Sequence, residues 1–248
     1  MTDMLDCSVI SLVGSPRRAH VSEHLREHQI PFQFFDAIDG RLLPERFHRH
    51  LSFWTQNNIT RKRLLPGELG VFASHFSLWQ EVADSGRPRV IFEDDIYLTE
   101  STAIAFPRLS SLAEEFGFVR LHATVHGTRP VGQRGKLTVS LCMCPKDAAL
   151  AYALTPEVAR RLVDCAAVWA EPVDHFISST YVHGIEVHVV EPCMAEIREQ
   201  FDSSIQPGKR TTIPLWLKPF VKPVHFANKH RIGRQLRRQK RMLSRETA

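Results

Sequence analysis

The sequence predicts one α/β domain, a Rossmann-like fold with a mostly parallel central sheet, followed by a basic tail. At the N-terminus a strand, a helix and a second strand fit within about 30 residues, as in a βαβ unit. A later apolar strand ends directly in three acids, and apolar runs alternate with amphipathic segments after it. We assign residues 1–207 to the domain and residues 208–248 to the tail.

The N-terminal unit begins with an apolar, β-branched run over residues 7–13, which is typical of a buried parallel strand. Gly14-Ser15-Pro16 ends this strand, and a modest helix over residues 19–28 follows. The second strand covers residues 32–35 and ends in Asp36-Ala37-Ile38-Asp39-Gly40. The mixed, polar stretch after it indicates an excursion over the domain surface.

The clearest helix begins at Pro66-Gly67 and ends at Ser85-Gly86. Apolar residues recur along it at three- and four-residue steps, so one stripe faces a core. The stripe consists of Leu69, Phe72, Phe76, Trp79 and Ala83. The strand over residues 89–92 then runs straight into Glu93-Asp94-Asp95.

The rest of the domain continues the alternation of helices and strands. We expect helices over 103–116, from Thr155 onward and over 172–182, and strands over 117–122, 137–144, 149–154 and 185–190. Thr155-Pro156-Glu157 is a strong helix start, because it combines a capping hydroxyl, a proline in the first turn and an early acid.

Composition excludes several classes of protein. With 248 residues, 43% hydrophobic and 24% charged, the chain is neither collagen-like, nor a coiled coil, nor largely disordered. No apolar run approaches about 18 residues, so we expect no membrane-spanning helix. The five cysteines are an odd number in a mid-sized chain, which favours a reducing cytosol over a disulfide framework. No basic leader precedes the first apolar run, so we expect no secretory signal.

The formal charge of +5 is unevenly distributed. Residues 208–248 hold 12 Lys or Arg and one acid, whereas the first 207 residues hold 20 basic and 26 acidic residues. Aromatic residues such as Trp216, Phe220 and Phe226 lie among these cations. This pattern favours an anionic membrane surface as partner. A solvated terminus and nucleic-acid binding are the alternatives, and we expect no nucleic acid.

The carboxylates at the end of the 89–92 strand need a counter-charge, because like charges at a half-buried strand end repel each other. Strand alternation places Glu93 and Asp95 on one side and Asp94 on the other. Two such oxygen ligands suit Mn²⁺ or Mg²⁺, whereas solvated turn acids are the structural alternative. A cation with open positions here favours a nucleotide-sugar transferase, although a nucleotidyltransferase or a phosphatase could use the same acids.

A series of short sequence blocks runs over roughly residues 6 to 206. They are Val9-Ile10-Ser11-Leu12, Ser15-Pro16-Arg17-Arg18, Phe35–Gly40, Pro66–Gly70, Ser74-His75, Leu78-Trp79, Ile91–Asp95, Tyr152–Thr155, Pro172-Val173-Asp174 and Ser203-Ser204-Ile205. In these blocks and in their order the sequence resembles glycosyltransferase family 25, the lipopolysaccharide and lipooligosaccharide galactosyltransferases related to collagen galactosyltransferases.

The resemblance implies a GT-A type catalytic domain over residues 1–207, a divalent metal, and inverting transfer of galactose from UDP-galactose to a lipid-linked oligosaccharide acceptor. It also implies a cytoplasmic enzyme, which the tail would hold at the inner face of a bacterial inner membrane. Transfer of another sugar, such as glucose or an N-acetylhexosamine, is the alternative in the same fold. A non-catalytic binding protein with a basic tail is the alternative of another class.

We predict Glu93 and Asp95 as metal ligands and Asp94 as a contact to the ribose or a holder of the loop. At the ends of the first two strands, Ser11, Arg17, Asp36 and Asp39 are predicted to contact the nucleotide, Arg17 through the diphosphate. Ordinary turn chemistry is the alternative for the two aspartates, and a solvated helix start is the alternative for the arginine.

Glu68, Ser74 and His75 are predicted to line the donor or acceptor pocket, because Glu68 and His75 lie two turns apart on one helix face. A structural hydrogen bond is the alternative for this histidine. Asp174 is the predicted general base, since inverting transfer needs a carboxylate to take the proton of the attacking hydroxyl. Helix capping is the alternative for Asp174. Glu191 and His188 are weaker candidates for base or third metal ligand.

Overall fold

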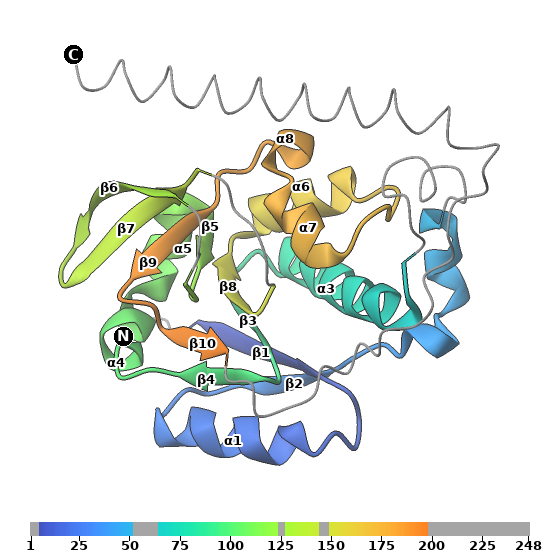
Figure 1. The fold of residues 1–248 in the computed structure, drawn as a ribbon, viewed down its shortest axis with the longest axis horizontal. Helices are drawn as coiled ribbons and strands as arrows, with labels where there is room; N and C mark the ends of the chain where they lie inside the picture. The colour runs from blue at the N-terminus through green and yellow to red at the C-terminus, as the bar shows by residue number, and fades with distance from the viewer. Residues whose placement is uncertain (1–4, 52–63, 124–126, 144–148, 198–248) are drawn as a thin grey trace.

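The computed structural model describes residues 5–51, 64–123, 127–143 and 149–197, which build around one large sheet (Figure 1). The predicted tail over 208–248, its boundary at residue 207 and the Ser203-Ser204-Ile205 block lie outside the described residues. An eight-stranded sheet has the order β2-β1-β3-β8-β5-β9-β7-β6, and a two-stranded sheet pairs β10 with β4.

The strands are β1 (Asp6–Ser11), β2 (Gln33–Asp36), β3 (Arg89–Glu93), β4 (Ile96–Leu98), β5 (Phe118–Arg120), β6 (Thr128–Arg134), β7 (Leu137–Cys142), β8 (Ala151–Leu154), β9 (His188–Glu191) and β10 (Ala195–Ile197). The α-helices are α1 (Arg17–Glu27), α3 (Pro66–Ser85), α4 (Thr102–Ala105), α5 (Leu109–Phe116), α6 (Pro156–Cys165), α7 (Val173–Ser178) and α8 (Thr180–His183). Short 3-10 helices are η1 (Gly40–Leu42), η2 (Glu45–His50) and η3 (Phe106–Arg108).

The α/β class is confirmed, but the prediction of a mostly parallel sheet is wrong, because the sheet is mixed. β1 pairs in parallel with β2 and β3, and β5 pairs in parallel with β9. β8 runs antiparallel between β3 and β5, and β7 runs antiparallel to β9 and β6. β8 is buried at all four positions, so its apolar run has the pattern expected of a buried parallel strand.

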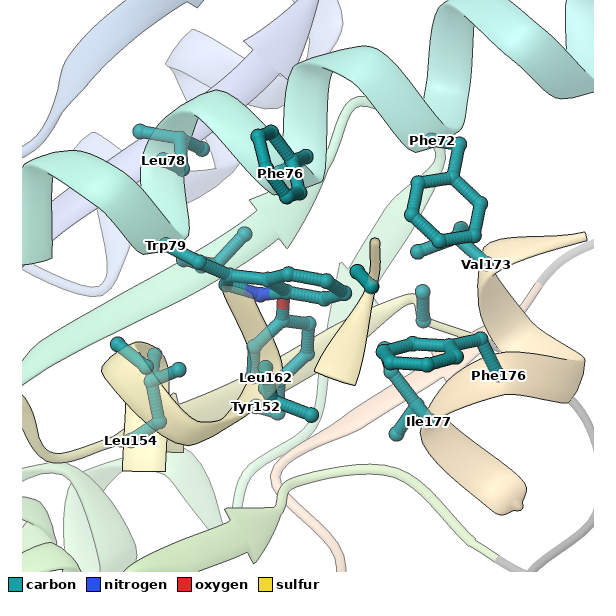
Figure 2. Packing of buried hydrophobic residues seen from close by; sticks show 14 of the residues in the cluster. Phe72, Phe76, Leu78, Trp79, Tyr152, Leu154, Leu162, Val173, Phe176 and Ile177 are labelled. Carbon is teal, nitrogen blue, oxygen red and sulfur yellow. The ribbon is translucent and has the colours of Figure 1, made fainter. Parts of the chain in front are cut away.

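Two hydrophobic cores cover the two faces of the sheet. On one face Ile10, Ile91 and Tyr152 pack with side chains from α3, α6 and α7, as Figure 2 shows for the aromatic centre of this core. On the other face Val9 and Phe92 pack with side chains from α1 and α5. Neighbouring strand residues thus point to opposite cores, as the two-residue period of a strand requires.

Two predicted helices are interrupted. The helix expected over 103–116 is divided at Pro107 into α4, η3 and α5, because proline lacks the N–H that an uninterrupted helix uses there. The helix expected over 172–182 is divided at Ser179, whose backbone leaves the helical region at φ −80° and ψ 57°. The sequence pattern also missed β6. It is an edge strand of the sheet within the described residues, and Pro130 is tolerated there because the outer side of β6 pairs with no described strand.

Within the described ranges, none of the helices combines the length and the apolar composition needed to cross a bilayer. The cysteines that the structure describes, Cys7, Cys142, Cys165 and Cys193, are free thiols.

Candidate active site

Three neighbouring strands bring their C-terminal ends to one edge of the sheet. β1 lies in parallel between β2 and β3, and the register places Ser11 beside Asp36 and Ile10 beside Glu93. The three strand ends therefore lie side by side. Because ligands of open α/β sheets bind outside the carboxyl ends of the strands, we take this edge as the candidate active site.

Asp94 holds the loop between β1 and α1 against this edge. Its Oδ2 accepts hydrogen bonds from the hydroxyls of Ser11 at 2.5 Å and Ser15 at 3.2 Å. Its Oδ1 accepts a bond from Arg17 Nη1 at 3.3 Å. These donors satisfy both carboxylate oxygens, so the structure gives Asp94 the loop-holding role that we predicted as one of its two roles. A contact to ribose stays a prediction.

The two carboxylate oxygens of Asp95 have different surroundings. Its Oδ2 lies 3.6 Å from Arg17 Nη1, whereas its Oδ1 is buried and has no hydrogen-bond partner. Burial, followed by the negative charge of Glu93, raises the pKa of Asp95 to about 6, and the positive charge of Arg17 partly opposes this rise. An ionised carboxylate in this position lacks a full complement of positive charge, which a cation would supply.

Glu93 ends β3 and faces α3. Its Oε1 lies 3.2 Å from His75 Nε2, and its side chain is 28% exposed. The predicted strand alternation stops at Glu93, because Asp94 and Asp95 form the turn into β4. Arg17 Nη1 therefore lies near the carboxylates of both Asp94 and Asp95. The negative charge of Glu93 is also close enough to raise the pKa of Asp95.

The residues at this edge fit a hard divalent cation. Glu93 and Asp95 offer carboxylate oxygens, the ligand type that Mn²⁺ and Mg²⁺ prefer, and both side chains are partly exposed. The buried, unpartnered Oδ1 of Asp95 is the oxygen that most needs such a ligand. Metal binding at these two residues stays a prediction.

A second set of metal-ligand side chains lies on α1. His24, Glu27 and His28 place one ligand atom each within 4.8 Å of one another. However, His24 Nε2 accepts the backbone N–H of Leu98 at 2.8 Å, so a neutral ring carries its proton on Nδ1. The Nδ1 atom that faces Glu27 therefore has no lone pair for a metal while the bond between α1 and β4 persists.

The other predicted residues near the strand ends bond within the protein. Arg18 Nη2 donates to the carbonyl of Ser11 at 2.7 Å and to Asp36 Oδ1 at 2.5 Å, and the Asp36 side chain is 68% exposed. Asp39 caps η1 by accepting the N–H of Arg41 at 2.9 Å. Asp39 thus makes the turn contact that we gave as its alternative, and nucleotide contacts by both aspartates stay predictions.

The three predicted pocket residues of α3 are buried. Glu68 accepts the backbone N–H of Leu65 at 2.7 Å and so caps the start of α3. The Ser74 hydroxyl donates to the carbonyl of Gly70 and accepts the N–H of Ile38 at 2.9 Å. The His75 ring is fully buried and bonds to Glu93 and Tyr152. Their contacts are with the protein, so contact with a substrate stays a prediction.

Asp174 lies in the first turn of α7, where Pro172 and not Asp174 occupies the capping position. Its carboxylate is 33% exposed and lies 3.9 Å from His175 Nε2. Burial raises the pKa of the neighbouring Glu171, which accepts a bond from the Ser179 hydroxyl, and the charge of Asp174 raises it further. The role of Asp174 as base stays a prediction.

The two weaker candidates lie on β9. Glu191 accepts a hydrogen bond from the Ser140 hydroxyl at 3.1 Å. Burial lowers the pKa of His188 to about 4, which keeps its ring neutral, and His188 Nδ1 is buried without a partner.

Several residues at this edge were missed by the sequence analysis. Ser15, Arg18 and Tyr152 lie within recognised sequence blocks, yet nothing in those blocks indicates that they bond to Asp94, Asp36 and His75. Glu171 directly precedes the Pro172-Val173-Asp174 block, and its partial burial and its hydrogen bond from Ser179 distinguish it from a surface acid. The contacts of Ser15, Arg18 and Tyr152 join residues 18 to 79 positions apart, which sequence spacing does not specify.

Comparison with known families gives one match to a family model. Glycosyltransferase family 25, described as LPS biosynthesis protein, matches residues 4–177. This range includes β1, α3 and β3 with the three acids, and it confirms the resemblance found in the sequence.

The individual relatives include proteins named for glycan biosynthesis and a protein named as probably inactive. The chain is 36% identical over 110 residues to the lacto-N-neotetraose biosynthesis glycosyltransferase LgtB of Neisseria meningitidis, covering 44% of this chain and 39% of LgtB. It is 37% identical over 96 residues to the lipooligosaccharide biosynthesis protein lic2B of Haemophilus influenzae, covering 38% and 34%. It is also 37% identical over 107 residues to the probable inactive glycosyltransferase 25 family member 3 of Rattus norvegicus, covering 41% and 19%. The matches thus span about a fifth of the rat protein and less than two fifths of the bacterial ones.

Proposed function

Because this chain belongs to glycosyltransferase family 25, we propose that it is an inverting, metal-dependent galactosyltransferase. The proposed donor is UDP-galactose, and the proposed acceptor is a sugar of a lipooligosaccharide or lipopolysaccharide. The names of LgtB and lic2B support this substrate class. We further propose that the domain has the GT-A type fold, with the donor at the carboxyl edge of β1, β2 and β3.

One observation carries this proposal: the buried, unpartnered Oδ1 of Asp95 beside the carboxylate of Glu93. Mn²⁺ or Mg²⁺ held by Glu93 and Asp95 would stabilise the negative charge that develops on the diphosphate leaving group. Arg17 lies 3.6 Å from Asp95 Oδ2, and this proximity supports the proposal that Arg17 pairs with the same diphosphate.

In the proposed reaction the acceptor hydroxyl attacks the anomeric carbon of galactose from the face opposite the diphosphate. The new bond joins the acceptor oxygen to this carbon, the bond from the carbon to the phosphate oxygen breaks, and UDP leaves with the electron pair. Asp174 takes the proton of the hydroxyl, which makes the acceptor oxygen a stronger nucleophile. Inversion follows because a single displacement occurs.

A non-catalytic role is the competing function, and the inactive rat relative is the observation that favours it. Such a protein could still bind a nucleotide, so binding alone does not separate the two functions. Measured turnover does: the enzyme slowly hydrolyses one member of a panel of nucleotide sugars in the presence of Mn²⁺, whereas the non-catalytic protein hydrolyses none. Transfer of another sugar is detected in the same panel.

The test of the metal site is calorimetric titration with UDP, with and without Mn²⁺, on the wild type and Asp95→Asn. We expect UDP binding to require Mn²⁺ in the wild type, and turnover of the variant to fall by about 100-fold or more. Asp84→Asn is the matched control, because its side chain is 80% exposed at the end of α3. Equal UDP affinity with and without Mn²⁺ would overturn the proposed metal dependence.

A further inference from the structure

A chain of three buried side chains leads from the core to Glu93. The indole Nε1–H of Trp79 donates to the Tyr152 hydroxyl at 2.9 Å, and Figure 2 shows this nitrogen directed at the Tyr152 oxygen. The Tyr152 oxygen lies 2.7 Å from His75 Nδ1, and His75 Nε2 lies 3.2 Å from Glu93 Oε1. Trp79 and His75 are completely buried, and Tyr152 is 1% exposed.

The chemistry of each group sets the direction of the hydrogen bonds. Indole nitrogen can only donate, so the Tyr152 oxygen is an acceptor toward Trp79. The single hydroxyl proton of Tyr152 is then available for His75 Nδ1, which must accept it with a lone pair. A neutral His75 consequently carries its proton on Nε2, where it donates to the carboxylate of Glu93.

Other proton arrangements leave buried groups unsatisfied. If His75 Nδ1 carried the proton, the Tyr152 oxygen would accept twice and its own proton would lack an acceptor. The lone pair of His75 Nε2 would then face the Glu93 oxygen, which is repulsive. A doubly protonated ring would also leave the hydroxyl proton without an acceptor. Each unsatisfied buried polar group costs its lost hydration, so the Nε2–H tautomer is favoured.

We propose that His75 is a positioning residue for Glu93, locked as the Nε2–H tautomer by Tyr152 and Trp79. Its N–H holds Glu93 Oε1 and leaves Oε2 for a cation. The bond thus acts in the way that outer-layer partners orient metal ligands in other proteins. The cation part rests on the proposed function, in which Glu93 is a metal ligand, whereas the tautomer follows from the hydrogen bonds alone.

Nuclear magnetic resonance of the full chain labelled with 15N-histidine tests the tautomer without any metal. The chain has 13 histidines, and the signals of His75 are those that disappear in His75→Gln. We expect a protonated, pyrrole-type Nε2 and an unprotonated, pyridine-type Nδ1. A protonated Nδ1 in the wild type would overturn the proposal.

Manganese affinity of Tyr152→Phe tests the positioning role. This substitution retains the ring that stacks on Phe118 but removes the hydroxyl that selects the tautomer. We expect the signal of the Nδ1–H tautomer to appear and Mn²⁺ binding to weaken about tenfold, although Tyr152 makes no bond to Glu93. Trp79→Phe removes the next donor in the chain and should weaken Mn²⁺ binding in the same direction.

The control for these variants is Val82→Ala, which opens a cavity at a buried position of the same helix, and Val82 has no side-chain group that takes part in the hydrogen-bonded chain. It should lower the unfolding temperature while retaining the Mn²⁺ affinity and the His75 tautomer. Equal Mn²⁺ affinity of Tyr152→Phe and the wild type would overturn the positioning role. If the wild type binds no Mn²⁺, the proposed metal function fails, and the tautomer measurement separately decides the state of His75.

Discussion

Gly40 and Gly70 meet with their backbones in contact. A Cβ added to Gly70 would lie 2.7 Å from Gly40 N, and one added to Gly40 would lie 2.6 Å from Gly70 N. Real Cβ atoms do not approach backbone atoms so closely, so these positions need the absence of a side chain. The contact joins the segment after β2 to α3, and the nearby bond from Ile38 N–H to the Ser74 hydroxyl strengthens the same junction.

Gly70→Ala should destabilise the protein. Alanine in place of glycine gains about 1 kcal/mol in a helix interior, whereas overpacking costs about 1–3 kcal/mol. The clashing atoms at Gly70 belong to backbone, which cannot rotate away, so the clash outweighs the helix gain. We expect a net loss of about 2 kcal/mol, measured by chemical unfolding. Gln80→Ala, on the exposed side of the same helix, should be neutral or slightly stabilising.

Asp95→Asn should stabilise the metal-free protein above about pH 6. The pKa of Asp95 rises from 3.8 to about 6 on folding, so the folded state binds the extra proton in this window and stability falls as the pH rises through it. Asparagine removes this penalty at high pH, and the gain disappears below about pH 4. A two-unit shift corresponds to about 3 kcal/mol, which we reduce to about 1 kcal/mol because the side chain is a third exposed.

Thermal unfolding in EDTA at several pH values measures this effect. Asp84→Asn removes an 80% exposed carboxylate and should change stability by less than about 0.5 kcal/mol. An Asp95→Asn variant that unfolds at a lower temperature than the wild type at pH 7 would contradict the prediction. In the presence of Mn²⁺ the order should reverse, because the variant has lost a ligand.

Asp174→Asn should lower kcat by about 100-fold or more with little change in the KM for the donor, because a general base acts only on the acceptor proton. The loss of a charge in the first turn of α7 costs less than about 1 kcal/mol, so the variant should fold. Steady-state assays with the best donor from the panel of nucleotide sugars measure both kcat and KM. Turnover close to the wild type would remove Asp174 from this role.

Comparison of Glu171→Gln with Asp174→Asn distinguishes the two acids as candidates for the general base. Glu171 is partly buried, its pKa is raised, and it accepts a hydrogen bond from Ser179, so it is a second acid within the same segment. If Asp174 is the base, Glu171→Gln should keep most of the turnover. The opposite pattern, with activity lost only in Glu171→Gln, would transfer the role to Glu171.

Deleting residues 209–248 should weaken binding to anionic membranes. This segment carries 12 Lys or Arg, and each contributes about 1 kcal/mol near an anionic surface at low salt. Co-sedimentation with phosphatidylcholine vesicles, with and without phosphatidylglycerol, should show at least a tenfold loss on the anionic vesicles only. Unchanged binding after the deletion would show that the tail has no membrane role.

The elements that could be predicted are those whose signal is local. The apolar stripe of α3 and the hydroxyl cap of α6 depend on residues within a few positions of one another, and both are found in the structure. Strand direction is not local: β8 is buried at every position, and this pattern is the same whether its neighbours run parallel or antiparallel. The mixed sheet was therefore not predictable from the pattern.

For the acids at the end of β3, too, some properties follow from the sequence and others only from the tertiary structure. Their position after an apolar strand and their need for a counter-charge follow from residue order alone. Their different partners do not: Asp94 bonds to Ser11 across 83 positions, Glu93 bonds to a histidine on α3, and Asp95 keeps one buried oxygen unsatisfied. Chain order sets which charges come together in one turn, whereas packing sets which of them are neutralised, because that depends on side chains brought from distant segments.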